Sequence, residues 1–345
     1  MKRALVVCPG RGSYDRAGLG QLSDRSPAAR EVVERCDAWR ASVGEPTVSE
    51  LDAADRFRTT LHVAGEHASL LTFACSLADL ADLDRSRYEI VGVTGNSMGW
   101  YTALAAAGAL SLDDAIRLVD TMGRYQRGNV LGGQLLYPVT GDDWREDPER
   151  VALVDRVLAE ARDAGHGAWW SIRLGGHAVL GADAGGLKYL QQHLPPVETS
   201  TRSFPLQLPL HSAFHTPLMA ATSERAFDEL GDLGWQAPEV PLIDGRGFVF
   251  RPRWADPAAL HDYTLGHQVV RPYDFTAAVT AALHHTAPDV VIVLGPGNSL
   301  GGPLARVLVQ SHWADVRTRE AWSERQAADP LLLSFGVAPQ RRMLV

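Results

Sequence analysis

"VGVTGNSMGWYTALAAAGAL", residues 91–110, has the pattern of a buried strand, a sharp turn with a serine at its tip, and a helix of small residues. Glycines stand two positions before and two positions after Ser97, where their missing Cβ lets the chain turn tightly. Such a serine stands clear of the sheet, at the positive end of the following helix. The Gly-x-Ser-x-Gly pentapeptide is common, so an incidental serine in a structural turn is the alternative, but the setting favours Ser97 as a nucleophile.

Strands and helices alternate through the first 130 residues. "RALVVCPGRGS" starts as a buried strand and ends in a Pro-Gly loop, and "SPAAREVVERCDAWRASV" and "ASLLTFACSLADLADL" have helical spacing. This alternation predicts a mostly parallel sheet with helices on both faces. A β-α-β-β-α segment then follows, which has the form of a split βαβ unit. We therefore expect an inserted α+β subdomain at 132–205 within an α/β core made of 1–131 and 206–345.

Bulk properties exclude several classes of protein. A net charge of −8 over 345 residues argues against general nucleic-acid binding. Neither a secretory signal nor a membrane-spanning apolar run is visible, so we expect a cytoplasmic protein without membrane contact. Cys8, Cys36 and Cys75 are far apart, which is typical of buried thiols in a reducing compartment. His284 and His285 would diverge on a helix, and we expect no metal site.

A nucleophilic serine needs a base and an oxyanion site. Two of the twelve histidines, His211 and His215, lie in the loop "QLPLHSAFHTPLM" ahead of a helix, although either could be a capping or core residue. Two backbone N–H groups must also face the developing oxyanion. Met98, directly after the serine, is one candidate, and the Gly-containing loop "CPGRGS" is the other. A phosphate-binding turn is disfavoured there because the loop lacks the Lys-Ser/Thr of a P-loop.

Five segments together resemble the malonyl-CoA:acyl-carrier-protein acyltransferase family. They are "VCPGRGS", "GNSMG" with its helix, "AFHTPLM", "LGHQVVRPYDF" and "VLGPGNSLGG". The matches follow the family order over nearly the whole chain and indicate a stand-alone member similar to trans-acting polyketide acyltransferases. The resemblance implies a hydrolase-like, mostly parallel α/β core with a ferredoxin-like subdomain.

The resemblance also implies a ping-pong mechanism in fatty-acid or polyketide biosynthesis. Ser97 takes an acyl group from a thioester while His215, rather than His211, removes its proton, and a phosphopantetheine thiol then attacks the ester. Arg11 and Met98 supply the oxyanion N–H groups, and a backbone carbonyl at Gln268 orients the histidine. The expected substrates are acyl-CoA and phosphopantetheinyl acyl-carrier protein, and no permanently bound cofactor is expected. The carrier protein is the expected partner of a monomeric enzyme.

The sequence departs from the family at its substrate-binding positions. Met122 stands where malonyl-using members carry an arginine, and a carboxylate buried beside methionine would cost several kcal/mol. We therefore expect a non-malonyl acyl group. Arg11 replaces a glutamine and either lies at the pocket entrance or binds a substrate carboxylate from another side. Asn96 replaces a histidine, His67 a glutamine, and Phe214 narrows one side of the pocket.

Three functions fit these residues: an acyltransferase, a hydrolase that clears acyl groups from carrier proteins, and a catalytically silent carrier-binding module. The first is favoured, and the retained serine and histidine argue against the third. Because carrier proteins are usually acidic and this chain is acidic too, docking requires a local basic patch. Arg251, Arg253 and Arg11 are candidates, with scattered surface arginines as the alternative.

Overall fold

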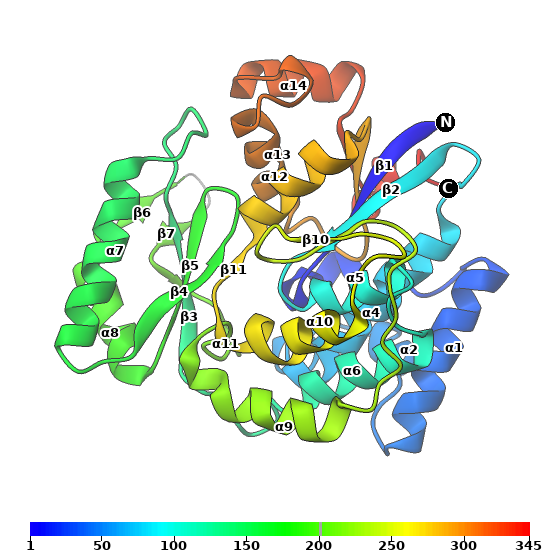
Figure 1. Ribbon diagram of the computed structural model, residues 1–345, viewed down its shortest axis with the longest axis horizontal. Helices are drawn as coiled ribbons and strands as arrows, with labels where there is room; N and C mark the ends of the chain where they lie inside the picture. Colours follow the sequence, from blue (N-terminus) through cyan, green and yellow to red (C-terminus); the bar gives the residue numbers. More distant parts are fainter. Residues whose placement is uncertain (200–201) are drawn as a thin grey trace.

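The computed structural model describes residues 1–199 and 202–345, which form two larger β-sheets, a separate two-stranded ribbon and the helices around them (Figure 1). The larger sheet has the strand order β10-β9-β2-β1-β12-β13. Its strands are β1 (Lys2–Cys8), β2 (Tyr88–Gly95), β9 (Leu242–Ile243), β10 (Val249–Phe250), β12 (Val290–Val293) and β13 (Leu332–Ser334). All neighbours pair in parallel except β9 and β10. This confirms the mostly parallel α/β core that the alternating pattern predicts.

Helices pack against this sheet and against one another. Between β1 and the second sheet they are α1 (Pro27–Ser42), α2 (Val48–Asp52), α3 (Thr59–His62), α4 (Gly65–Asp82), α5 (Gly99–Ala106) and α6 (Leu112–Arg124), with the short turns η1 (Arg11–Ser13) and η2 (Arg16–Gly18). Towards the C-terminus they are η3 (Pro217–Met219), α9 (Ala220–Leu230), α10 (Pro257–Asp262), the π-turn η4 (Tyr263–His267), α11 (Gln268–Val270), α12 (Phe275–Thr286), α13 (Gly301–Gln310), η5 (Trp313–Asp315), α14 (Arg319–Ala328) and α15 (Ala338–Arg341). Helix α1 lies in a stretch with helical spacing, and the Ser26 side chain caps its start by accepting a hydrogen bond from the Ala29 N–H.

The smaller sheet has the order β11-β4-β5-β3-β8. Its strands are β3 (Gly133–Pro138), β4 (Ala168–Arg173), β5 (His177–Ala182), β8 (Leu206–Gln207) and β11 (Tyr273–Asp274). The segment 132–205 also contains the helices α7 (Pro148–Asp163) and α8 (Ala184–His193). It further contains a two-stranded ribbon of β6 (Val197–Glu198) and β7 (Ser203–Phe204). The segment 132–205 thus contains most of this layer, but both edge strands come from beyond it. The edge strand β8 lies in the stretch "SFPLQLPL", whose sequence indicates a possible returning strand, whereas the two residues of β11 carry no readable periodicity.

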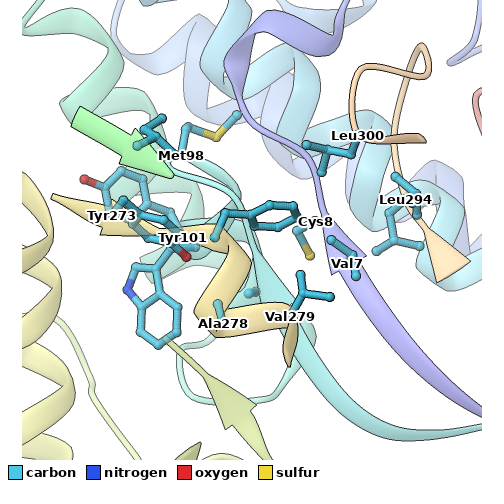
Figure 2. Packing of buried hydrophobic residues seen from close by; sticks show 14 of the residues in the cluster. Val7, Cys8, Met98, Tyr101, Tyr273, Ala278, Val279, Leu294 and Leu300 are labelled. Carbon is cyan, nitrogen blue, oxygen red and sulfur yellow. The ribbon is translucent and has the colours of Figure 1, made fainter. Parts of the chain in front are cut away.

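The hydrophobic core continues to the end of the larger sheet where β2 meets α5. Figure 2 shows Val7 and Cys8 of β1, Ala278 and Val279 of α12, and Met98 beside the turn that joins β2 to α5. The three cysteines are buried free thiols, and burial raises their pKa. In the part of the chain that the structure describes, no helix is long and apolar enough to cross a membrane.

A buried ion pair joins the helices on one side of the sheet. Arg40 of α1 and Asp120 of α6 are fully buried, with Nη1 2.8 Å from Oδ1. Arg40 also donates to the Glu66 carbonyl of α4, at 2.7 Å. The pair therefore ties three helices together, and one of them carries Met122.

Candidate active site

The turn after β2 has the backbone conformation of a nucleophile elbow. Ser97 has φ 55°, in the left-handed region, which costs a non-glycine residue roughly 1–3 kcal/mol and persists only where the surroundings impose it. A Cβ on Gly95 would lie 2.2 Å from the Gly99 carbonyl oxygen, and one on Gly99 would lie 2.1 Å from that of Cys8. Glycine is therefore required at both positions, as the sequence pattern indicates.

The elbow presents the Ser97 hydroxyl to His215. The Oγ lies 2.7 Å from Nε2, and Nδ1 lies 2.6 Å from the Gln268 carbonyl oxygen. A carbonyl can only accept, so Nδ1 carries a hydrogen, and in the neutral ring Nε2 is then the acceptor for the serine hydroxyl. The structure thus brings together the three residues that the resemblance singled out.

Burial sets the protonation state of this imidazole. His215 is 3% exposed, and desolvation lowers its pKa to about 4, although the hydrogen bond to Gln268 acts in the opposite direction. The ring is consequently neutral near pH 7. A neutral imidazole hydrogen-bonded to a serine hydroxyl can take the hydroxyl proton as the oxygen attacks.

Gln268 also contacts the elbow through its side chain. Its Nε2 donates to the Ser97 carbonyl at 3.2 Å, and its Oε1 accepts from the Tyr101 hydroxyl at 2.9 Å. A second tyrosine, Tyr273, donates to the Gly95 carbonyl at 2.6 Å. Sequence reasoning missed both tyrosines, because nothing in their local pattern distinguishes them from ordinary core residues.

Two backbone N–H groups near the serine are available for an anion. Among the described residues, neither the Arg11 N–H nor the Met98 N–H has a hydrogen-bond acceptor. The two loops that carry them are in contact, since a Cβ on Gly10 would lie 3.0 Å from the Asn96 carbonyl oxygen. These N–H groups can therefore serve as the oxyanion site that the sequence predicts.

A cavity of about 640 Å³ opens beside the serine. It lies between the two sheets and is bounded by the η1 loop, α5, α6, the inner face of the smaller sheet and the start of α13. Of the predicted site residues, eight line it: Arg11, Asn96, Ser97, Met98, Met122, Phe214, His215 and Gln268. The size is typical of pockets that bind small molecules.

The wall of this cavity on α6 is apolar. Met122 lies there with Val119, one turn earlier on the helix. Arg124 does not reach the cavity, and its Nε lies 3.1 Å from the buried carboxylate of Asp120. Helix α6 therefore contributes no cation to the pocket at this wall.

Arg11 does contribute a cation to the cavity, and its side chain is buried. It is 7% exposed, its Nη2 donates to the Leu210 carbonyl at 2.8 Å, and its guanidinium lies 4.9 Å from the centroid of the Phe214 ring. No carboxylate in the described chain forms an ion pair with it. Burial lowers its pKa to about 10, so it stays charged at neutral pH.

The tip of Arg11 reaches the wall formed by α4 and α6. A Cβ on Gly65 would lie 2.4 Å from the Arg11 Nη1 and 2.8 Å from the Cβ of Gln126. Gln126 follows Met122 by one helical turn, so the guanidinium ends close to the apolar wall. The sequence could not show this, because Arg11 is more than a hundred residues from α6.

His67 is not a cavity residue, and its predicted substrate-binding role is corrected. It lies on the far side of α4, where its Nδ1 accepts a hydrogen bond from the Arg40 Nη2 at 2.8 Å. Burial and the charge of Arg40 lower its pKa. Ser69 and Gln126 line the cavity on this side instead. A one-residue uncertainty in aligning a helix rotates the side chain by about 100°, which explains the error.

Two polar residues near the serine differ in their surroundings. The Asn96 Oδ1 is buried without a hydrogen-bond partner in the described chain. His211 lines the cavity but directs its Nδ1 to the Pro209 carbonyl, 2.7 Å away.

Within residues 1–199 and 202–345 no cluster of side chains suited to a metal ion is found.

Comparison with known proteins relates this site to acyl transfer. The acyl transferase domain family matches residues 5–159. The malonyl CoA-acyl carrier protein transacylase of Bacillus subtilis (strain 168) is 25% identical over 309 residues, which cover 89% of this chain and 91% of that protein. The malonyl CoA-acyl carrier protein transacylase of Salmonella typhimurium is 23% identical over 342 residues, which cover 96% of this chain and 99% of that protein.

Solved structures share the fold. The malonyl-CoA:ACP transacylase of Synechocystis sp. PCC 6803 superposes with a TM-score of 0.74 at 18% identity, covering 100% of both chains. A malonyl-transacylase solved in complex with its type II polyketide acyl-carrier protein gives a TM-score of 0.71 at 18% identity. The match covers 89% of this chain and 93% of that one.

Proposed function

The chain belongs to the acyltransferase family of the malonyl-CoA:acyl-carrier-protein transacylases, and from this we propose that Ser97 and His215 are its catalytic dyad. It is an acyl-carrier-protein acyltransferase, which moves acyl groups between CoA or carrier-protein thioesters and carrier-protein thiols in fatty-acid or polyketide biosynthesis. One observation carries the proposal: the 2.7 Å hydrogen bond between the two side chains, at the wall of a cavity where the N–H groups of Arg11 and Met98 have no acceptor among the residues that the structure describes.

In the first half-reaction Ser97 Oγ attacks the thioester carbonyl carbon and its proton moves to His215 Nε2. The negative charge that develops on the carbonyl oxygen is held by the N–H groups of Arg11 and Met98. The C–S bond then breaks, and the leaving thiolate takes the proton from His215. The products are a free thiol and an acyl ester on Ser97, and the Gln268 carbonyl stabilises the transient imidazolium.

The second half-reaction reverses these steps with a different thiol. The phosphopantetheine thiol of an acyl-carrier protein gives its proton to His215, and the sulfur attacks the ester carbonyl of acyl-Ser97. The C–O bond breaks and the serine oxygen recovers its proton from the imidazolium. The acyl-carrier protein leaves, and the dyad returns to its starting state.

The pH dependence of the first step tests the role of His215. Since burial lowers its pKa to about 4, the neutral base persists as the pH falls through 6.5, the usual range for histidine. We expect kcat/KM for acylation to stay near its maximum down to about pH 5.5 and to fall only below that. Stopped-flow acylation from a small thioester measures the profile, with circular dichroism as the control for folding. Half-maximal activity at pH 6.5 or above would contradict the assignment.

We further propose that the acyl group is not malonyl. The support is Met122, which replaces the family's arginine on an apolar wall and suits an adaptable acyl chain. The opposing candidate is malonyl transfer with Arg11 as the carboxylate partner. It is favoured by the buried guanidinium in the same cavity, which forms no ion pair with a carboxylate of the described residues.

Two variants separate these candidates. If the acyl group lacks a carboxylate, Met122→Arg should raise malonyl loading of Ser97 at least about tenfold, since a charge-assisted pair is worth about 1.5–3 kcal/mol. Arg11→Gln keeps the backbone N–H and should then leave the low malonyl loading unchanged. If instead the native protein loads malonyl well and Arg11→Gln lowers this tenfold or more, the second candidate is correct. Intact mass after incubation with acetyl, malonyl and longer acyl thioesters gives the readout.

The same assay separates transfer from hydrolysis. Acyl-carrier proteins bearing each acyl group are mixed with the enzyme and a second, unloaded holo carrier. Appearance of the acyl group on the second carrier establishes transfer, whereas release of free acid alone would identify the alternative, an acyl-carrier-protein hydrolase. A catalytically silent carrier-binding module would form no adduct on Ser97.

A further inference from the structure

A histidine that the proposed mechanism does not use also faces the catalytic cavity. His211 is partly buried and lines the cavity, four residues before the proposed base, His215. Its Nδ1 lies 2.7 Å from the Pro209 carbonyl oxygen, which can only accept, so Nδ1 carries the hydrogen. Burial, together with the charge of Arg11, lowers its pKa to about 3, so the ring is neutral at pH 7. The Nε2 therefore carries a lone pair and acts as a hydrogen-bond acceptor.

This acceptor faces open space in the cavity. A Cβ on Gly12 would lie 3.9 Å from the His211 Nε2, and it would meet no other described atom within 4 Å apart from its chain neighbours. Gly12 lines the cavity and follows Arg11, whose N–H belongs to the proposed oxyanion site. In the described part of the chain, no group donates a hydrogen bond to this Nε2. Its lone pair can thus meet a donor on a bound molecule.

Arg11 places hydrogen-bond donors beside this acceptor. Its Nη2 donates to the carbonyl of Leu210, the residue before His211, at 2.8 Å. Both side chains also lie against Phe214, since the guanidinium is 4.9 Å and the imidazole 6.3 Å from the centroid of its ring. The Arg11 Nε and Nη1 have no acceptor among the described residues. The cavity therefore presents N–H donors and one lone pair close together, next to the apolar wall that carries Met122.

We propose that Arg11 and His211 bind a hydroxyl group on the acyl chain, so that the enzyme is selective for hydroxyacyl thioesters, an inference that rests on the proposed function. A hydroxyl accepts a hydrogen bond from a guanidinium N–H and donates one to an imidazole lone pair, so it satisfies both groups at once. Because Arg11 also supplies the oxyanion N–H, the hydroxyl lies close to the thioester carbonyl, on the second or third carbon of the chain. The remaining carbons lie against the wall at Met122.

A malonyl carboxylate fits these two groups less well. It pairs with the Arg11 guanidinium, but at neutral pH it has no hydrogen to donate, so its oxygens face the lone pair of His211. Protonating the imidazole to relieve this contact is unfavourable, because burial and the charge of Arg11 lower its pKa to about 3. An unsubstituted acyl chain is also disfavoured, since it displaces water from both groups and leaves them without a partner.

The test compares acyl groups that differ by one hydroxyl. Ser97 is loaded from the N-acetylcysteamine thioesters of butanoate, 2-hydroxybutanoate, 3-hydroxybutanoate and malonate, and intact mass follows the rate. We expect kcat/KM for one of the two hydroxybutanoyl groups to exceed that for butanoyl at least about tenfold, because a site built to bond a hydroxyl rejects the analogue that lacks it. Equal loading of butanoyl and both hydroxybutanoyl groups would overturn the proposal, as would a preference for malonyl. If none of the thioesters acylates Ser97, the proposed function fails instead.

Variants of the two binding residues separate selectivity from a structural role. His211→Leu removes the acceptor and should lower the ratio of hydroxybutanoyl to butanoyl kcat/KM at least about tenfold, and Arg11→Gln should lower the same ratio. His211→Gln places an amide oxygen near the position of Nε2 and should restore most of it. The matched control is His177→Leu, at another histidine that lines the cavity, and it should keep the native ratio.

The pattern of losses decides what His211 binds. An equal loss for butanoyl and hydroxybutanoyl in His211→Leu would show that His211 contacts the thioester arm or supports the fold, and the proposal would be wrong. The same conclusion follows if His177→Leu lowers the ratio as much as His211→Leu does. If His211→Leu does not fold, the selectivity of the native enzyme and the ratio in Arg11→Gln decide the question.

Discussion

Replacing Ser97 with alanine is expected to abolish the covalent acyl-enzyme and to lower the rate of acyl transfer at least about a thousandfold. The reason is that the variant removes the atom that attacks the thioester, while the oxyanion N–H groups and the cavity remain and supply only residual catalysis. Intact mass after incubation with an acyl thioester detects the adduct, and the discharge of a carrier-bound acyl group gives the rate.

The matched control for this variant is Ser299→Ala. Ser299 also lines the cavity with a hydroxyl, but that hydroxyl bonds to Ser13, 2.7 Å away, and it has no contact with His215. The control should form the adduct at close to the native rate. An adduct that persists in Ser97→Ala would place the nucleophile elsewhere and refute the mechanism.

Replacing Asp120 with alanine is expected to lower the free energy of unfolding by about 3–5 kcal/mol, because the fully buried guanidinium of Arg40 loses its hydrogen-bonded carboxylate and keeps only the more distant Glu45, at 3.8 Å. The variant also removes the acceptor of the Trp39 Nε1 hydrogen bond, at 2.9 Å. Equilibrium unfolding in urea measures the loss.

Asp113→Ala provides the comparison on the same helix. Asp113 pairs with Arg35, but both side chains are exposed, and such a pair contributes about 0–1 kcal/mol. Equal losses for the two aspartates would show that burial does not set the strength of the α1–α6 connection. A stable Asp120 variant that still loads acyl groups would show that this connection does not support the cavity wall.

Local patterns account for the parts of this molecule that the sequence predicted well. The glycines around Ser97 act through contacts with the turn itself and with the adjacent strand, so their spacing is enough to predict the elbow. The alternation of strands and helices is local in the same sense. For Ser97 and His215, by contrast, the residues alone offered two histidines, and the family resemblance was needed to choose between them.

The sequence by itself determined the α/β class, the strained serine turn and the glycine-containing loop after β1, because each depends on backbone conformations encoded within a few residues. Only the tertiary structure decided that Arg11 is buried and ends beside α6, that His67 bonds Arg40 outside the cavity, and that Gln268 holds the elbow through its side chain. These outcomes depend on the order of the strands and on the packing of helices distant in sequence. The burial of a side chain, its hydrogen-bond partners and its pKa are set by neighbours that are distant in the sequence, and a local sequence pattern does not contain these neighbours.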